Sequence, residues 1–223
     1  MDYKRITLFA GHYGSGKTNI AVNFAIRLKE VFENVSIADI DIVNPYFRTK
    51  DSETILKEKG IRLISSEYAN TNVDVPALPS EIYSVTENRQ AASVVDIGGD
   101  DRGALALGRY SPKIKEENDY NMLLVINKYR PQTRCAEDVI EIMHEIEEAG
   151  GLKFTGIVNN SNLGPETTKE DVLSSVSYAE KVSEITGLPI YMTTVKAELF
   201  DGLSDKIDNL FPINIYVNWE DRI

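Results

Sequence analysis

The clearest chemistry in the sequence lies in one short run near its start. Gly11-His12-Tyr13-Gly14-Ser15-Gly16-Lys17-Thr18 fits the pattern G-x-x-x-x-G-K-[ST], with an apolar run before it and a helical pattern after it. The glycines let backbone N–H groups turn inward around a phosphate. Lys17 would bridge the β- and γ-phosphates, and the Thr18 hydroxyl would bind Mg²⁺. The run predicts a site for a nucleoside triphosphate with magnesium, lined by Gly11, His12, Tyr13, Gly14, Ser15, Gly16, Lys17, Thr18 and Asn19.

Three aspartates offer the carboxylates that hydrolysis at such a site needs. Asp39 and Asp41 are two residues apart at the end of an apolar run. On a strand both would face the phosphates, one toward the metal and the other toward the attacking water. Asp96 ends another apolar run and precedes Gly98 and Gly99. This pattern fits an acid that holds magnesium, followed by a flexible loop whose N–H group senses the γ-phosphate. Alternatively, Asp39 and Asp41 only cap the turn after a strand.

The elements that must position these residues alternate along the chain. Most apolar runs of strand length are continuous rather than alternating, which is typical of strands buried on both faces of a parallel sheet. Amphipathic helical patterns lie between them. We therefore expect one α/β domain over residues 1–223, with a doubly wound, mostly parallel sheet of about seven strands and helices on both faces. The strand runs are residues 6–10, 35–40, 61–64, 93–97, 122–126, 154–158 and 189–192, and the helical patterns are residues 18–32, 133–149 and 167–186.

Composition and charge limit the classes of function. The formal net charge is -11, which disfavours nonspecific binding to nucleic acid and to anionic membranes. Cys135 is the only cysteine, so the chain cannot form an intrachain disulfide or a cysteine-paired metal site. The first apolar run is too short for a secretory signal or a membrane span. These features predict a cytoplasmic protein with no stable membrane anchor and no nucleic-acid partner.

Together, the phosphate loop and the acidic segments resemble the MinD/ParA family of P-loop ATPases, to which the nitrogenase iron protein and the arsenical-pump ATPases also belong. The resemblance implies that ATP and Mg²⁺ are bound. It implies that Asp39 and Asp96 support the metal and that Asp41 orients the attacking water. The family's two nucleotide-sensing loops correspond to about residues 41–48 and 98–104.

The resemblance also places the base. In the family an asparagine that ends the sixth strand recognises adenine, and Asn159 stands at that position; the following segment, with Thr194 and Val195, flanks the base. A separate motif, Asn127-Lys128-Tyr129-Arg130, is similar to the guanine signature N-K-x-D. Its last residue is Arg130, which cannot accept the hydrogen bonds that guanine donates. We therefore expect adenine. Arg130 is expected in an ion pair or an interface contact, with an approach to the γ-phosphate as the alternative.

One position departs from the family. Most members carry a second lysine just after the first glycine of the loop, which reaches across a dimer to the partner's phosphates. Here that position is His12, which is shorter and only partly charged near neutral pH. A nucleotide-dependent homodimer is therefore possible but is not assured by this residue. The alternative is a loop histidine that contacts solvent or a nucleotide-sensing loop.

Three functions follow from these features. The first is an ATPase switch that hydrolyses ATP to ADP and phosphate and so regulates, matures or loads an unidentified protein partner. The second is a metabolic enzyme that uses ATP to activate a carboxylate, as dethiobiotin synthetase and the cobyrinic-acid amidating enzymes do. In that case the segment 44–48 would line a substrate pocket. The third is a nucleotide-binding module with negligible turnover.

Overall fold

The structure is a computed structural model that describes residue 1 and residues 3–41, 49–65, 80–99 and 101–216. Two sequence predictions fall largely outside these ranges. They concern the first nucleotide-sensing loop, at about residues 41–48, and the segment 44–48 that would line a substrate pocket.

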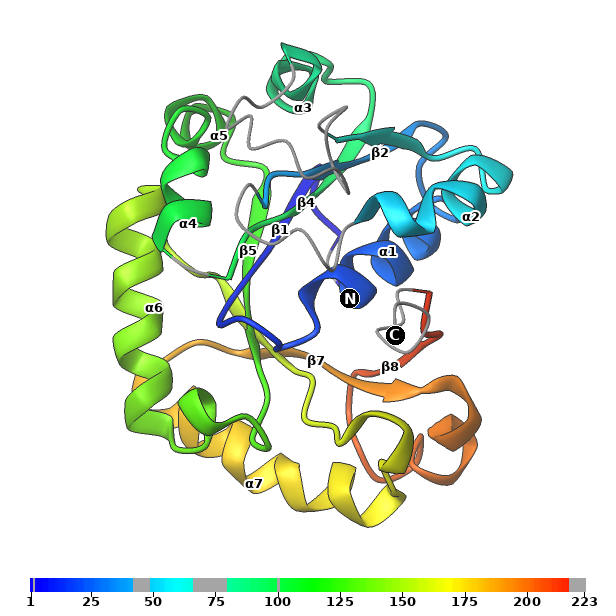
Figure 1. The fold of residues 1–223 in the computed structure, drawn as a ribbon, viewed down its shortest axis with the longest axis vertical. Coiled ribbons are helices and arrows are strands. Elements are labelled where there is room, and N and C mark those ends of the chain that lie inside the picture. Colours follow the sequence, from blue (N-terminus) through cyan, green and yellow to red (C-terminus); the bar gives the residue numbers. More distant parts are fainter. Residues whose placement is uncertain (2, 42–48, 66–79, 100, 217–223) are drawn as a thin grey trace.

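A single sheet runs through the whole described part of the chain (Figure 1). It has eight strands in the order β3-β2-β4-β1-β5-β6-β7-β8, and every neighbouring pair is parallel. The first strand therefore lies near the middle, and the loop that follows it opens at the carboxyl edge of the sheet. The strands are β1 (Ile6–Ala10), β2 (Val35–Asp39), β3 (Arg62–Ile64), β4 (Ala92–Asp96), β5 (Tyr120–Ile126), β6 (Gly156–Asn159), β7 (Ile190–Lys196) and β8 (Leu210–Ile213).

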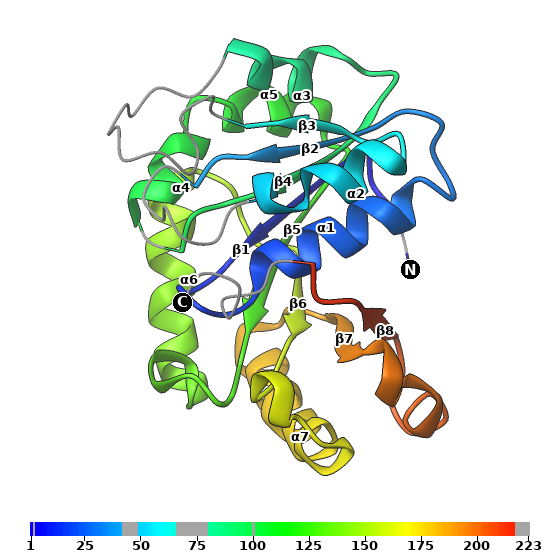
Figure 2. The same cartoon turned by 45° about the vertical axis from the view of Figure 1, so that its right-hand side comes forward.

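Helices cover both faces of this sheet (Figure 2). Strand β1 shows why, because its side chains alternate between two apolar cores. Leu8 packs into the core that α6 and α7 cover, and Phe9 packs into the core that α1 covers. Both side chains are fully buried, as a strand between two helical layers requires. The helices are α1 (Lys17–Leu28), α2 (Glu53–Glu58), α3 (Ser84–Glu87), α4 (Asp101–Leu107), α5 (Ser111–Glu117), α6 (Ala136–Gly150) and α7 (Lys169–Thr186).

Local sequence explains where the long helices begin and end. Thr168 and Asp171 form a capping box at the start of α7, each side chain accepting the other's backbone N–H. Gly151 and Gly187 follow α6 and α7 in the left-handed conformation, which glycine adopts without strain. These residues determine where α7 begins and where α6 and α7 end, and the two helices pack against the face of the sheet that includes β5 and β6.

The predicted fold class is confirmed, with one correction. Each of the seven predicted apolar runs overlaps a strand, but the sheet has an eighth strand that was not predicted. Strand β8 is short and contains Pro212, which cannot donate a ladder hydrogen bond and so weakens the strand pattern. Proline is tolerated here because β8 lies at the edge of the sheet.

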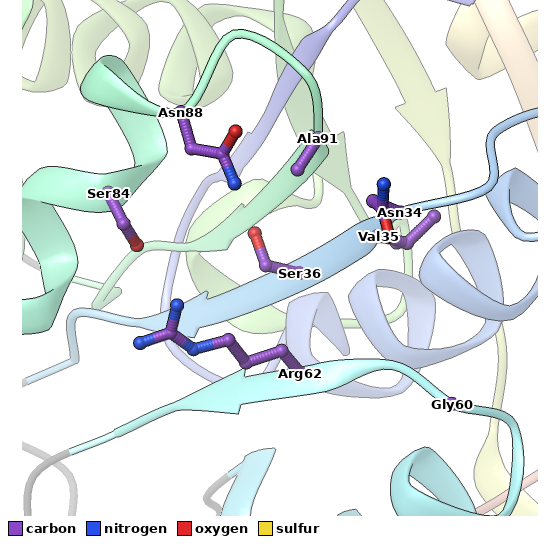
Figure 3. A pocket seen from close by; sticks show the side chains of 8 residues that line it. All are labelled: Asn34, Val35, Ser36, Gly60, Arg62, Ser84, Asn88 and Ala91. Carbon is purple, nitrogen blue, oxygen red and sulfur yellow. The ribbon is translucent and has the colours of Figure 1, made fainter.

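The amino edge of the sheet carries a small cavity, of about 180 Å³ (Figure 3). It lies where β2, β3 and β4 begin, and Ser36, Arg62 and Asn88 are among its lining residues. Ligands of parallel α/β sheets bind at the opposite, carboxyl edge. This cavity is therefore separate from the site that the sequence predicts.

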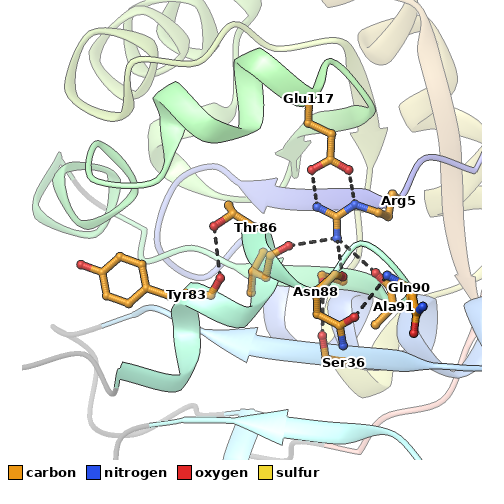
Figure 4. A network of polar contacts seen from close by, with 10 residues as sticks. Arg5, Ser36, Tyr83, Thr86, Asn88, Gln90, Ala91 and Glu117 are labelled. Atoms are coloured by element: carbon orange, nitrogen blue, oxygen red, sulfur yellow. Dashed lines mark hydrogen bonds and ion pairs between the residues drawn. The ribbon is translucent and has the colours of Figure 1, made fainter.

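A buried arginine stabilises that amino edge (Figure 4). Arg5 forms a bidentate ion pair with Glu117 and donates to the carbonyls of Val85, Asn88 and Ala91. It thus ties β1 to α5 and to the connection between α3 and β4. Because the guanidinium has several partners, loss of Glu117 would leave a buried charge incompletely paired and destabilise the fold.

In the described part of the chain, no helix is both long enough and apolar enough to cross a lipid bilayer.

Candidate functional site

The glycine-rich run forms the loop between β1 and α1, as its position at the carboxyl edge of the sheet requires. Gly14 and Gly16 have φ angles of 75° and 91°, in the left-handed region that other residues rarely adopt. Gly11 lies so close to β5 that an added Cβ would be 2.4 Å from the carbonyl oxygen of Val125. The loop therefore needs glycine both for its turns and for its approach to the sheet.

Lys17 and Thr18 begin α1 directly after this loop. The Lys17 side chain is largely buried, and its Nζ donates to the backbone carbonyl of His12 at 3.2 Å. The Lys17 side chain thus folds back so that its ammonium group lies against the loop that would bind the phosphates. The Thr18 side chain lies against the carboxyl of Asp96 and lowers the pKa of that group. The helix start and the end of β4 therefore meet at one point.

Asp39 and Asp96 end the adjacent strands β2 and β4 and are paired in register. Both are buried, with relative exposures of 5% and 2%. The carboxylate of Asp39 accepts from the backbone N–H of Asp41 at 3.0 Å and of Thr49 at 3.2 Å. The Thr49 hydroxyl donates to Asp96 at 3.1 Å. Thr49 could not be predicted from the sequence, because a threonine outside any motif does not indicate which carboxylate it contacts.

Burial raises the pKa of Asp96 to about 6. This value already includes the negative charge of Asp41, which acts in the same direction as burial, and the charge of Lys17 and the hydroxyls of Thr18 and Thr49, which act in the opposite direction. A buried carboxyl that resists ionisation is stabilised as an anion when a cation binds beside it. A cation bound beside Asp96 would therefore lower the pKa of this carboxyl.

The pKa of Asp96 leads to a prediction about stability. Between about pH 4 and about pH 6 the folded protein holds a proton on Asp96 that the unfolded chain releases, so the raised pKa lowers stability as pH rises through this window. The metal-free Asp96→Asn variant lacks this loss. In urea unfolding, the free energy of unfolding of Asp96→Asn relative to that of wild type is expected to increase between about pH 4 and about pH 7. The increase should reach up to roughly 3 kcal/mol. Parallel pH profiles would contradict the assignment.

The oxygen donors at this point fit Mg²⁺. Thr18 supplies a hydroxyl, and Asp39 and Asp96 supply carboxylates; all are hard ligands. Within the described ranges, no group of three or more His, Cys, Asp or Glu side chains is arranged to hold a metal alone. Magnesium is usually held by one or two protein groups together with substrate phosphates and water. The donor set thus fits a metal that binds with the nucleotide.

The loop after β4 packs against the phosphate loop. A Cβ added to Gly99 would lie 2.6 Å from the backbone nitrogen of Tyr13 and 3.1 Å from Nζ of Lys17. A Cβ on Gly98 would lie 3.1 Å from a carboxylate oxygen of Asp41. Glycine at these positions therefore lets the loop approach Tyr13 and Lys17 at Gly99 and Asp41 at Gly98. The structure brings together the residues that the sequence assigned to the γ-phosphate end of the site.

The His12 side chain stays within its own loop. Its Nδ1 lies 2.9 Å from the carbonyl oxygen of Tyr13, so this nitrogen carries the proton in that contact. Tyr13 is exposed, with a relative exposure of 52%. The nucleotide-dependent homodimer stays a prediction, and an exposed aromatic side chain beside His12 is available to such an interface.

The residues predicted to contact the base lie at the ends of β6 and β7. The Asn159 side chain is fully buried, donates to Ser175 Oγ at 2.9 Å and accepts from Ser161 Oγ at 2.7 Å. Its amide therefore already has protein partners on both sides. Thr194 and Val195 are buried in β7. Their role beside adenine stays a prediction.

Arg130 lies beside the phosphate loop, next to Gly14. Its Nε and Cζ would be 3.6 Å and 3.7 Å from a Cβ added to Gly14. The guanidinium is exposed and, among the described residues, makes no hydrogen bond or ion pair. Asn127, which begins the same motif, accepts instead from the backbone N–H groups of Tyr129 and Asn162 and so holds the turn. An arginine in this place adds positive charge to the rim of the loop.

Of the comparisons with known proteins, the one with solved structures supports the fold. No family model matches the chain, and no curated protein matches it in sequence. Among solved structures, FtsY from Mycoplasma mycoides has 22% identity and a TM-score of 0.56 over 85% of this chain and 59% of its own. Chloroplast FtsY from Physcomitrella patens has 17% identity and a TM-score of 0.58 over 86% of this chain and 59% of its own. The 54 kDa signal recognition particle protein from Aeropyrum pernix, in complex with GDP, has 17% identity and a TM-score of 0.52 over 84% and 40%.

This likeness shows that the chain has a P-loop NTPase α/β fold, a parallel sheet with helices on both sides. The first of these structures is matched over only 59% of its length, so it bears on this fold alone. The more specific likeness to the MinD/ParA family, with its preference for ATP, is not supported by these neighbours and stays a prediction.

Proposed function

We propose that this protein binds a nucleoside triphosphate with Mg²⁺ on the loop from Gly11 to Thr18 and hydrolyses it to the diphosphate and phosphate. One observation carries the proposal: Lys17 and Thr18, at the start of α1, lie beside Asp96, which ends β4 at the carboxyl edge of the sheet. A cation for phosphate, a hydroxyl and a carboxylate for the metal are the groups that phosphoryl transfer needs.

Each residue then has a distinct part. The backbone N–H groups of the loop and the start of α1 hold the β-phosphate, and Lys17 binds across the β- and γ-phosphates. Magnesium, held by Thr18 and supported by Asp39 and Asp96, neutralises phosphate charge. Asp41 orients the attacking water, which is consistent with its place beside Gly98 and near Asp96.

A switch that acts on a protein partner is the leading biological role. Its support is the contact of the loop after β4 with both Tyr13 and Lys17, because a loop so placed can respond to the presence of the γ-phosphate. A carboxylate-activating enzyme is the alternative. The two roles differ in one measurable way: a switch releases phosphate without a second small molecule, whereas the enzyme requires its carboxylate substrate.

The base is proposed to be adenine, with guanine as the second candidate. Arg130 stands where the guanine signature has an acidic residue and cannot accept hydrogen bonds. Against this, structures of FtsY from Elizabethkingia anophelis and of the Aeropyrum pernix protein are complexes with GDP. These neighbours share the fold, and their ligand makes GTP the required comparison.

A competition experiment decides between the two bases. Purified protein with Mg²⁺ and a fluorescent ATP analogue is titrated with unlabelled ATP and then with GTP. A site without an acceptor for the guanine edge is expected to prefer ATP by roughly 10-fold or more, since an unpaired buried hydrogen-bonding group costs about 1–3 kcal/mol. Stronger competition by GTP would overturn the adenine assignment and leave the triphosphate site standing.

A further inference from the structure

The phosphate loop is held from outside by one buried side chain. Asn160 directly follows β6, and its backbone N–H extends the ladder by donating to Ile126 at 2.9 Å. Its side-chain Nδ2 donates to the carbonyl oxygen of Ser15 at 2.6 Å. The residue is 4% exposed, so this contact lies in the protein interior. Asn160, which is distant in sequence, is thus hydrogen-bonded to the middle of the phosphate loop.

A second residue fixes the orientation of that amide. The Thr194 hydroxyl, on β7, donates to Oδ1 of Asn160 at 2.5 Å, and Thr194 is also buried. A flipped amide would place its oxygen against the Ser15 carbonyl, so that two acceptors would face each other. Only one orientation of Asn160 therefore satisfies both neighbours. Thr194, Asn160 and Ser15 thus form a chain of hydrogen bonds, here called the relay, that runs from β7 through the residue after β6 to the phosphate loop.

The relay determines which way the loop's own donors point. The carbonyl of Ser15 and the N–H of Gly16 belong to one planar peptide unit, in which they point to opposite sides. Fixing the carbonyl toward Asn160 therefore directs the Gly16 N–H away from β6. In a phosphate-binding loop, N–H groups must face the ligand and carbonyls must face away. The Asn160 contact meets this requirement before any nucleotide arrives.

Gly16 leaves the room that this contact needs. A Cβ at Gly16 would lie 2.2 Å from Nδ2 of Asn160, closer than nonbonded atoms can approach. The φ angle of 91° also requires glycine. Gly16 therefore serves the backbone turn and the approach of Asn160 together.

We propose that Asn160, oriented by Thr194, is a positioning residue that holds the phosphate loop in its ligand-binding conformation. This inference rests on the proposed function, because it assigns a part in triphosphate binding to two residues outside the loop. Pre-organisation of this kind lowers the cost of ordering the loop when the ligand binds. Asn160 touches the loop backbone and acts on the ligand only through it.

The test measures binding of the β,γ-imido analogues of ATP and GTP, each with Mg²⁺, by calorimetry. Asn160→Ala is expected to weaken binding of the preferred analogue roughly 10- to 100-fold, and Thr194→Val roughly 5- to 10-fold, because the first loses the contact and the second only its orientation. The double variant is expected to bind within about twofold of Asn160→Ala alone, since both changes break one relay.

Two matched controls remove buried groups at the amino edge of the sheet. Thr86→Val deletes a buried hydroxyl that donates to Tyr83, and Asn121→Ala deletes a buried amide at the start of β5. Both are expected to bind like wild type. Thermal unfolding without nucleotide shows which variants fold. If Asn160→Ala does not fold, the test uses Thr194→Val, because valine has nearly the same shape as the threonine that it replaces.

The outcomes separate this inference from the proposed function. Wild-type protein that binds neither analogue overturns both. Wild-type binding with Asn160→Ala or the folded Thr194→Val within twofold of it overturns the positioning role alone. Full additivity in the double variant also overturns it, because two independent effects would then replace the relay. Weakened, non-additive binding with unaffected controls supports it.

Discussion

Replacement of Lys17 by alanine is expected to lower the affinity for Mg²⁺-bound nucleoside triphosphate by roughly 100-fold or more, since loss of one partner of a buried charge pair costs about 2–5 kcal/mol. The Lys17 ammonium group already lies over the loop, bonded to His12 and beside Gly99. The bound β- and γ-phosphates would lose their direct cation. Calorimetric titration of the β,γ-imido analogues measures the change.

The matched control for this variant is Lys29→Ala. Lys29 caps the other end of the same helix and donates to the backbone of Glu33, far from the phosphate loop. Its replacement removes the same charge from α1 and is expected to leave the affinity unchanged. Equal losses in the two variants would show that general charge, rather than the position of Lys17, attracts the ligand.

Asp41→Asn is expected to lower the rate of phosphate release by roughly 100-fold or more, because a positioned carboxylate that accepts a proton from water contributes about that much to catalysis. The affinity for the triphosphate should change little, since Asp41 lies beside Gly98 and supports the water rather than the phosphates. Single-turnover phosphate release and equilibrium binding separate the two effects.

An exposed carboxylate serves as the control for Asp41→Asn. Asp208 lies in the connection before β8, and Asp208→Asn makes the same charge change away from the site. It is expected to hydrolyse nucleotide like wild type. An unaltered rate in Asp41→Asn would remove this residue from its proposed place beside the attacking water.

Local sequence predicted the parts of the fold and of the site that depend on neighbouring residues. The loop from Gly11 to Thr18 is readable because its glycines, its lysine and its hydroxyl must be consecutive to wrap one phosphate. Asp39 and Asp96 could be predicted because each ends a largely apolar strand, and the parallel sheet then brings them into register.

The parts that sequence could not predict depend on contacts between distant segments. Asn160 contacts Ser15, which is 145 residues away in the sequence. Nothing in the run Asn159-Asn160-Ser161 shows that Asn159 contacts α7 while Asn160 contacts the phosphate loop. Thr49 bonds to Asp96 across 47 residues. Strand β8 escaped prediction because its ladder partner β7, rather than its own sequence, holds it in the sheet.

The central claim is that the loop from Gly11 to Thr18 binds a nucleoside triphosphate together with magnesium. Its most direct test is calorimetric titration of purified protein with the β,γ-imido analogues of ATP and GTP, with Mg²⁺ and then with EDTA. Saturable binding of at least one analogue, strengthened by Mg²⁺ and lost in Lys17→Ala, is the expected result. Absence of binding to both analogues, or binding that Lys17→Ala leaves intact, would contradict the claim.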